Sequence, residues 1–338
     1  MKQRVLVTGG TGYIGSHTVV CLQEQGYDVV IIDNLSNSSI KVLDAICKIT
    51  GIKPGFEQLD LCDNDKLTAF FKRHDNISSI IHFAAFKSVG ESVQEPLKYY
   101  RNNLLSLLNL LQAMGNNDIK NIVFSSSCTV YGEPDELPVT ETTPLKPAVS
   151  PYGNTKRICE DMIRESAETI GINGISLRYF NPIGAHSSAL IGEAPSETSD
   201  NLIPPITQTA IGKRRSFEVY GNDYDTPDGS CIRDYIHVVD VAKAHVAAIE
   251  RLNNKKNKYA YEVFNLGTGK GNSVFEVIET FERVSGIKLN YKIADRRPGD
   301  IVKVYADTSF ANKELGWRAE KTLEDMVGSA WEWEKKRQ

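Results

Sequence analysis

Short apolar runs alternate with helically patterned stretches over the first half of the chain. Runs that are buried on both faces are typical of parallel strands covered by helices. We expect helices at 18–25 and 95–114, and a third that begins near residue 150 and continues through residue 163. The pattern up to about residue 180 predicts a doubly wound parallel sheet of the Rossmann type, an α/β fold. The expected strands are 5–7, 29–32, 56–59, 79–83, 121–124 and 175–177.

Beyond residue 180 the composition shifts toward Ser, Pro, Gly and Asn until about residue 230, which predicts the long loops of a smaller α/β domain for substrate. A strand at 233–237 and a helix at 239–252 follow, and we expect this part to return to the main sheet. Residues 263–266 with Gly267, Gly269 and Gly271, together with the segment 296–300, complete the second domain. The expected division is 1–180 for the nucleotide domain and 181–338 for the substrate domain, packed as one body.

The helix 95–114 is apolar on more than one side. Such a helix is either fully buried in a core or covered by a helix of a second subunit, and the pattern leaves both interpretations open. The expected core face is Leu97, Tyr100, Leu104, Leu107, Leu108 and Leu111, with Leu105 and Leu110 lying elsewhere on the helix.

Charge and cysteine content argue against several classes of protein. A net charge of −4 without a basic block argues against a nucleic-acid surface. Six scattered cysteines without a CxxC pair favour reduced thiols in a cytoplasmic protein. We expect neither a signal peptide nor a membrane span.

His82, His186 and His237 lack the spacing of metal ligands, so we expect no metal site. Cys128 is expected to pack rather than react.

A glycine-rich turn lies between the first strand and the first helix. Gly10-x-Gly12-x-x-Gly15 and Gly9-x-x-Gly12-x-x-Gly15 both fit a dinucleotide fingerprint. Glycines let the backbone approach a pyrophosphate, and the helix N-terminus then offers free N–H groups to the phosphates. A tight strand–helix turn is the alternative interpretation. The strand, the helix and the acid described next favour dinucleotide binding.

Polar and small residues follow the next strands. Asp33 lies 18 positions after Gly15, where an acid hydrogen-bonds an adenosine ribose and repels a 2′-phosphate, so NAD is favoured over NADP. Residues 60–61 are placed to meet the adenine. Residues 84–85 either border the cofactor or pack closely, and one of Asn102 and Asn103 is expected to turn toward the cofactor.

A tyrosine and a lysine are placed for proton transfer. Tyr152 and Lys156 are four residues apart, so they share one face of a helix. A tyrosine with a reference pKa of about 10 is a poor base, but a neighbouring ammonium and an oxidised nicotinamide both favour the phenolate. Ser127, at the end of a strand, can bond the same substrate oxygen. For an isolated tyrosine and lysine of this spacing, the alternative is an ordinary i,i+4 pair on the helix surface, but the nearby nucleotide turn and Ser127 favour the functional interpretation.

These segments together resemble a known family. The glycine turn 8–15, the serine strand 125–127 and the stretch 152–156 resemble the extended short-chain dehydrogenase/reductase superfamily. Within it, the chain is similar from end to end to the UDP-glucose (UDP-galactose) 4-epimerase family. Further matching segments are 33–35, 82–85, 89–92, 177–182, 221–224, 233–238 and 296–300.

The resemblance implies a mechanism at C4 of a UDP-hexose. Tyr152 takes the proton of the 4-hydroxyl with help from Ser127, while tightly bound NAD+ takes the hydride. The 4-keto sugar rotates and the hydride returns to its other face. Lys156 holds the nicotinamide ribose and keeps Tyr152 acidic. A homodimer through helix 95–114 and the helix that carries Tyr152 is also implied.

The resemblance also implies two sets of binding residues. The NAD set is Gly9, Gly12, Tyr13, Ile14, Gly15, Asp33, Asn34, Asn37, Asp60, Leu61, Phe83, Ala84, Ala85, Lys87, Asn102, Ser127, Tyr152, Lys156 and Phe180. The UDP-sugar set is Ser127, Tyr152, Asn181, Asn201, Leu202, Val219, Tyr220, Arg233, Arg297, Asp300 and Val304.

Rival activities differ at a few positions. Sugar-nucleotide 4,6-dehydratases and uronate decarboxylases carry acids where this chain has Cys128 and Thr129. Asp33 disfavours an NADP-dependent reductase. Another NAD-dependent enzyme acting on sugar nucleotides remains an alternative, as does a non-catalytic nucleotide sensor, although a sensor would not need Tyr152 and Lys156.

Val304 bears on substrate choice. In the family pattern a bulky tyrosine at this position restricts the pocket near the C2 substituent, whereas a small side chain leaves room for an acetamido group. We therefore expect that UDP-N-acetylglucosamine and UDP-N-acetylgalactosamine also interconvert. The alternative is that Val304 is an ordinary core residue of a strand.

Overall fold

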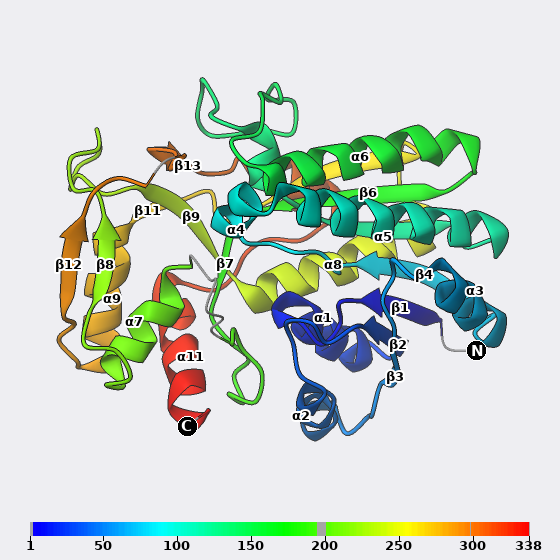
Figure 1. The fold of residues 1–338 in the computed structure, drawn as a ribbon, viewed down its shortest axis with the longest axis horizontal. Coiled ribbons are helices and arrows are strands. Elements are labelled where there is room, and N and C mark those ends of the chain that lie inside the picture. Colours follow the sequence, from blue (N-terminus) through cyan, green and yellow to red (C-terminus); the bar gives the residue numbers. More distant parts are fainter. Residues whose placement is uncertain (1–2, 195–200, 298, 338) are drawn as a thin grey trace.

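A seven-stranded parallel sheet forms the larger lobe of the computed structural model (Figure 1), which describes residues 3–194, 201–297 and 299–337. The order across the sheet is β10-β6-β5-β4-β1-β2-β3. This confirms the predicted Rossmann-type α/β fold. The strands are β1 (Arg4–Thr8), β2 (Asp28–Asp33), β3 (Gly55–Gln58), β4 (Ile77–His82), β5 (Asn121–Ser127), β6 (Asn173–Tyr179) and β10 (Tyr261–Leu266).

Helices cover both faces of this sheet because alternate side chains of its strands are apolar in both directions. On β1, Val5 and Val7 join the core on one face and Leu6 joins the core on the other, and none of the three is exposed to solvent. The first face carries α1 (Tyr13–Glu24), α2 (Lys41–Thr50) and α8 (Val238–Asn253). The second carries α3 (Asn64–Arg73), α5 (Pro96–Asn116) and α6 (Pro151–Thr169), with the short α4 (Val89–Gln94) before α5 (Figure 1).

The chain leaves β1 and β4, which are neighbours, toward opposite faces of the sheet. At this switch point the loops separate and open a crevice at the carboxyl edge. The backbone closes tightly there, since Gly9 N–H donates to Ile32 O at 2.8 Å and Phe83 N–H donates to Thr8 O at 3.0 Å. The next segments of chain therefore start from fixed points beside the crevice.

A smaller lobe is built around β9. This strand pairs in parallel with β7 and β13 and antiparallel with β11, while β8 and β12 form a separate parallel pair (Figure 1). Helix α11 packs against α7, α9 and β9. The strands are β7 (Asn181–Ile183), β8 (Phe217–Tyr220), β9 (Ile232–His237), β11 (Gly271–Ser273), β12 (Tyr291–Ala294) and β13 (Lys303–Val304). The helices are α7 (Ile203–Ala210), α9 (Val274–Ser285), α10 (Ser309–Glu314) and α11 (Leu323–Lys336).

Two expectations about the second half have different outcomes. Of the segment 233–252, helix α8 does return to the main sheet, where it packs against α1, β5 and β6. The expectation is wrong for 233–237, because β9 pairs with β7, β11 and β13 in the smaller lobe. The assignment of 263–266 to the second domain is wrong, because β10 is the edge strand of the main sheet and pairs with β6, Asn265 opposite Arg178. An apolar strand does not specify its neighbour, so the sequence pattern could not reveal this pairing.

Several boundaries also differ from the expectation. Helix α1 begins at Tyr13 rather than 18, because the glycine fingerprint runs into its first turn. Strand β5 includes the three serines, so Ser127 is its last residue.

The side of helix α5 that is buried differs from the predicted one. Leu97 is 81% exposed and Leu108 is 43% exposed, so neither belongs to the core face. Leu110, expected elsewhere, is fully buried against the sheet together with Leu107. The helix therefore presents an apolar side to solvent in this single chain.

None of the helices within the described ranges combines the length and the hydropathy needed to cross a bilayer.

Candidate active site

A cavity of about 1500 Å³ lies at the carboxyl edge of the main sheet, between the two lobes. The glycine turn after β1, the loop after β4, the end of β5 and the start of α6 form its wall on the larger lobe. Strands β7, β8, β9 and β13 contribute on the smaller lobe. Every residue of the three predicted sets, catalytic, NAD-binding and UDP-sugar-binding, lines this cavity.

The glycine turn is shaped for a phosphate-bearing ligand. Gly9 has φ +71°, a left-handed conformation, and a Cβ on it would lie 2.8 Å from Ala84 N. A Cβ on Gly15 would overlap the carbonyl oxygen of Gly9. Gly10 does not line the cavity and packs against Ile31. The structure thus favours the spacing that starts at Gly9, and its cradle fits the diphosphate of a dinucleotide.

The carboxylate of Asp33 is fixed in the cavity wall beside the glycine turn. It accepts hydrogen bonds from Thr11 N–H at 3.2 Å, Leu35 N–H at 2.9 Å and the Ser38 hydroxyl at 3.1 Å. Leu35 has φ +60°, so the chain bends sharply to bring these donors around the acid. A fixed negative charge at this point disfavours a 2′-phosphate and favours NAD.

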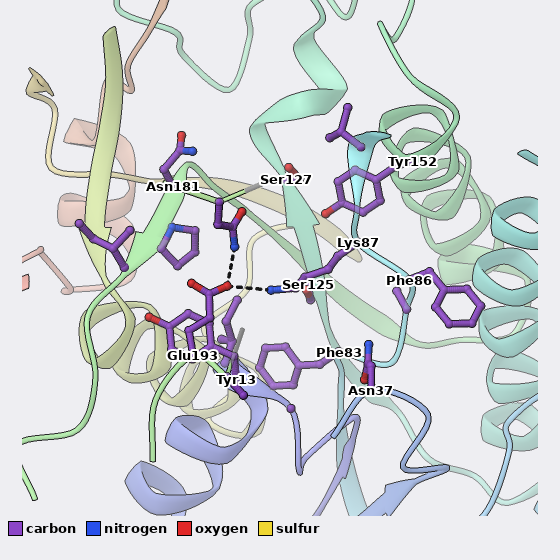
Figure 2. A pocket seen from close by; sticks show the side chains of 18 of the residues that line it. Tyr13, Asn37, Phe83, Phe86, Lys87, Ser125, Ser127, Tyr152, Asn181 and Glu193 are labelled. Carbon is purple, nitrogen blue, oxygen red and sulfur yellow. Dashed lines mark hydrogen bonds and ion pairs between the residues drawn. The ribbon is translucent and has the colours of Figure 1, made fainter. Parts of the chain in front are cut away.

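The catalytic side chains come from two neighbouring elements. Helix α6 starts at Pro151, and the Ser150 hydroxyl caps it by accepting from Gly153 N–H at 3.1 Å. Tyr152 therefore sits in the first helical turn, and Figure 2 shows its hydroxyl directed into the cavity beside Ser127. Ser127 ends β5, and its Oγ accepts from Thr129 N–H at 3.2 Å.

Burial dominates the acid–base properties of this pair. It raises the pKa of Tyr152, Tyr179 adds to the rise, and the hydrogen bond with Ser127 opposes it. Burial lowers the pKa of Lys156 to about 8, and Lys156 Nζ donates to Ser125 O at 2.6 Å. Desolvation dominates the pKa of Tyr152 in the protein alone, and the expectation that Lys156 and an oxidised nicotinamide together favour the phenolate stays a prediction.

The structure separates the two asparagines of α5. Asn103 is buried, accepts from Phe86 N–H at 2.9 Å, and donates to Phe86 O and to Thr155 Oγ1, each at 3.1 Å. Asn103 thus joins the loop after β4 to α6. Asn102 is the one that lines the cavity, as predicted for a cofactor contact.

Two arginines converge at the smaller lobe. Arg233 Nη2 lies 3.8 Å from Asp300 Oδ1, and Arg297 Nε donates to Asp300 Oδ2 at 3.1 Å. The Arg297 guanidinium also stacks over the Tyr220 ring, 4.7 Å from its centre. Paired arginines beside an aromatic ring suit a nucleoside diphosphate. Pro298, in the same predicted segment, lies outside the described residues.

Val304 is both buried and part of the wall. It is 4% exposed, lies opposite Arg233 in the parallel β13–β9 pair, and borders the cavity. The two interpretations offered for it, core residue and pocket residue, therefore hold together.

Glu193 is a wall residue that the sequence did not single out. Its carboxylate accepts from Lys87 Nζ at 3.2 Å and from Asn201 Nδ2 at 2.5 Å, as Figure 2 shows. Its carbonyl accepts from Trp333 Nε1 at 3.1 Å. Because Lys87 and Trp333 lie 106 and 140 residues from Glu193 in the sequence, no local spacing could have identified it.

Cys128 and Cys231 also border the cavity. Burial raises the pKa of Cys128 to about 12, so its thiol is not a ready nucleophile. The expectation of an unreactive thiol agrees with this, but Cys128 contributes to the cavity wall and does not only pack in the core.

The histidines that were considered as ligands have hydrogen-bonding partners. His82 Nδ1 is 2.8 Å from Thr8 Oγ1, His186 Nδ1 is 2.9 Å from Ser188 Oγ, and His237 Nε2 is 3.1 Å from Ser329 Oγ. Within the described part of the chain, no group of three or more His, Cys, Asp and Glu residues is arranged to hold a metal ion.

Comparisons with known proteins agree with this geometry. The chain matches the model of the NAD dependent epimerase/dehydratase family over residues 5–267. It is 48% identical over 332 residues to the UDP-glucose 4-epimerase of Yersinia enterocolitica, covering 98% of this chain and 97% of that protein. The UDP-glucose 4-epimerase of Bifidobacterium longum, solved with NAD+ and UDP, has a TM-score of 0.94 at 47% identity, with 99% and 98% of the two chains covered.

The enzyme of Stenotrophomonas maltophila, solved with NAD and formylated UDP-arabinopyranose, also has a TM-score of 0.94, at 46% identity and 99% and 98% coverage. The resemblance drawn from the sequence motifs is confirmed by these matches. The chain belongs to the NAD dependent epimerase/dehydratase family, and the three relatives named above, which it matches over nearly their full length, are UDP-glucose 4-epimerases.

Proposed function

We propose that this protein is an NAD-dependent UDP-hexose 4-epimerase that interconverts UDP-glucose and UDP-galactose. The observation that carries the proposal is the shared cavity. The Tyr152–Ser127 pair lies between a glycine cradle on one lobe and a pair of arginines on the other. A reaction that needs a dinucleotide and a sugar nucleotide side by side requires such an arrangement.

The larger lobe is the NAD side of this cavity. Gly9, Gly12 and Gly15 admit the diphosphate, Asp33 takes the adenosine ribose, and Lys156 takes the nicotinamide ribose. When bound, NAD+ accepts a hydride from C4 of the sugar and later returns it.

The smaller lobe holds the UDP moiety. Arg233 and Arg297 neutralise the diphosphate, and Tyr220 offers its ring to the uracil. Asn181, Asn201, Leu202 and Val219 complete this wall. With the UDP moiety held firmly, the 4-keto sugar can rotate about its bond to the diphosphate. Either face of the sugar ring can then be presented to the site of hydride transfer.

Tyr152 moves the proton of the 4-hydroxyl. Its hydroxyl is directed into the cavity beside Ser127, so both side chains can bond the same substrate oxygen. Because burial raises the pKa of Tyr152, the phenolate needs a positive charge close by. That charge comes from Lys156 together with the oxidised nicotinamide, so the base forms only when the cofactor is in its oxidised state.

Two measurements test this function. The purified protein is denatured and the released nucleotide identified, and the native protein is incubated with UDP-galactose. We expect NAD in the first and UDP-glucose in the second, with Tyr152→Phe lowering kcat by about 10² or more. Absence of UDP-glucose contradicts the proposal and supports the nucleotide sensor. Stoichiometric consumption of added NADH supports another NAD-dependent reaction instead.

We further propose that the N-acetylated pair, UDP-N-acetylglucosamine and UDP-N-acetylgalactosamine, is also interconverted. Its support is the small buried side chain of Val304 on the wall of the cavity. Val304→Tyr is expected to lower kcat/KM for the acetamido sugars by about tenfold or more relative to the plain hexoses, since the added ring occupies the space of the acetamido group. An unchanged ratio of the two activities contradicts this assignment.

We propose a homodimer through the exposed side of α5 and the neighbouring α6. The support is the exposed apolar surface at Leu97 and Leu108. Light scattering after size exclusion is expected to give twice the mass of the chain, and Leu97→Glu to shift the protein toward the monomer. A parent protein that runs as a monomer contradicts the dimer.

A cytoplasmic location is proposed from the scattered cysteines, which carry no disulfide in the structure. Fractionation of the source cells tests it.

A further inference from the structure

Behind the catalytic side chains lies a buried ion pair that the proposed function does not use. Glu160 on α6 accepts from Arg178 Nε at 2.9 Å and from Arg178 Nη2 at 2.6 Å. The two side chains are 3% and 6% exposed, and neither borders the cavity. A third donor, the Ser126 hydroxyl, reaches Glu160 at 2.5 Å. The carboxylate therefore joins α6, β5 and β6 at one point.

This junction lies close to two of the predicted catalytic residues, Ser127 and Lys156. Ser126 precedes Ser127 on β5, and Glu160 follows Lys156 by four residues on the same face of α6. Lys156 Nζ donates to Ser125 O at 2.6 Å, so α6 is fixed to β5 at two successive residues. A sliding or tilting of α6 would have to break both contacts.

The hydrogen bonds continue from Arg178 across the sheet. Arg178 Nη1 donates to the Tyr131 hydroxyl at 2.9 Å, and that hydroxyl donates to Asn265 Oδ1 at 2.7 Å. Asn265 Nδ2 then donates to Val139 O at 3.0 Å. Tyr131 and Asn265 are fully buried, so water does not compete with these bonds.

The far end of the chain of bonds reaches the substrate wall. Val139 N–H donates to Tyr305 O at 2.9 Å, and Asp307 N–H donates to Val139 O at 2.8 Å. Val304, the residue beside the predicted sugar site, directly precedes this segment. The catalytic helix and the substrate wall are thus joined by one continuous set of buried polar contacts.

We propose that Glu160 and Arg178 are positioning residues that set the distance between the Tyr152–Lys156 helix and Ser127, and align both with the wall at Val304. A buried ion pair is weak evidence for stability, because well-packed apolar residues often serve equally well. Bidentate hydrogen bonds differ from apolar contacts in fixing direction as well as distance. The inference rests on the proposed epimerase function, because it assigns the pair a role in that reaction.

The chain provides a matched control. Arg251 on α8 and Glu262 on β10 form a second bidentate pair, with Nε to Oε2 at 2.7 Å and Nη2 to Oε1 at 3.0 Å. Their side chains are 7% and 6% exposed, and neither borders the cavity. Glu262→Gln should therefore damage stability much as Glu160→Gln does, but the hydrogen bonds it weakens go to Arg251 and Lys258 and not to α6 or β5.

The test compares Glu160→Gln with Glu262→Gln, using UDP-galactose as substrate. Both are expected to lower the melting temperature by similar amounts. Glu160→Gln is expected to lower kcat by about tenfold or more while KM stays within about threefold, because misplacement by a fraction of an ångström affects the reacting geometry most. Glu262→Gln should leave kcat within about twofold. The inference is overturned if Glu160→Gln and Glu262→Gln have the same kcat, whether both retain the kcat of the parent protein or both lose it to the same extent.

Hydrogen exchange followed by mass spectrometry gives a second readout that does not depend on turnover. Glu160→Gln is expected to speed exchange at 121–131 and 151–160, and Glu262→Gln at 251–266. If either single variant fails to fold, the apolar pairs Glu160→Met with Arg178→Met and Glu262→Met with Arg251→Met take their places. A parent without turnover refutes the proposed function, whereas exchange that rises uniformly in the Glu160 variant refutes the positioning role.

Discussion

Gly15 lies where a single methyl group decides whether the first turn of α1 can close. A Cβ at this position overlaps Gly9 O, while Gly9 itself is held against Ala84. We expect Gly15→Ala to widen the turn and to reduce the NAD that copurifies with the protein by about tenfold or more. The bound nucleotide is quantified by chromatography after denaturation.

Gly115→Ala in α5 is the control for this prediction. A Cβ there meets only Ile170 Cβ at 4.0 Å, which is ordinary contact, and alanine favours a helix. If both variants retain the same amount of nucleotide, the glycine turn is not the cofactor cradle.

Single residues differ in how far their roles could be foreseen. Asp33 and Tyr152 are predictable because a strand end and a helical spacing place them without knowledge of the rest of the fold. Glu193 is not, because its partners Lys87 and Asn201 are brought to it only by folding. The rise in the pKa of Tyr152 was not foreseen, since the sequence shows a nearby lysine but not the depth of burial.

The N-terminus of α6 links an ordinary helix cap to catalysis. Ser150 caps the turn that contains Tyr152. Ser150→Ala is expected to lower the free energy of unfolding by about 1 kcal/mol, and also kcat, because fraying of the first turn displaces the phenol. Urea denaturation and steady-state kinetics measure the two effects.

The cap of α11 is the matched comparison. Thr322 accepts from Asp325 N–H at 3.2 Å, away from Tyr152. Thr322→Ala should cost about as much stability while leaving kcat unchanged. Loss of kcat in proportion to stability in both variants would show that the cap of α6 has no special part in the reaction.

Whether a segment is a helix or a strand was predicted better than which other elements it packs against. Apolar runs predicted six of the seven strands of the main sheet, β1 to β6, because most of these strands are buried on both sides. They did not reveal that β10 lies beside β6, or that α5 turns Leu97 and Leu108 away from the core. Both facts depend on which surfaces meet after folding, and amphipathic spacing cannot distinguish two apolar sides of one helix.

The whole molecule carries several histidines that are buried in the neutral form. Because protonation is easier in the unfolded chain, where the ordinary pKa is about 6.5, the unfolded state binds more protons below that pH. Stability therefore falls as the pH drops from about 6.5 toward 4. Burial lowers the pKa of His17 and His82 to about 3 and of His237 and His245 to about 4.

Urea midpoints at pH 7, 6 and 5 measure this loss, which can reach about 1.4 kcal/mol per pH unit for each histidine. Asp234 and Asp240 have pKa values raised by burial, which acts in the opposite direction but at lower pH. His245→Leu removes one titrating group, and its ring packs on Phe83 without a partner for Nε2. A slope identical to that of the parent contradicts the assignment.

The return of β10 to the main sheet has a consequence for the newborn polypeptide. Until residues 261–266 leave the ribosome, β6 is an unpaired edge strand of the sheet. Helix α8, which packs on β5 and β6, is also synthesised after these strands. Such an edge is a template for pairing with another chain. A truncated fragment of the first 180 residues should therefore aggregate when it is expressed alone. A chaperone that binds exposed strand edges of the nascent chain should raise the yield of the intact protein.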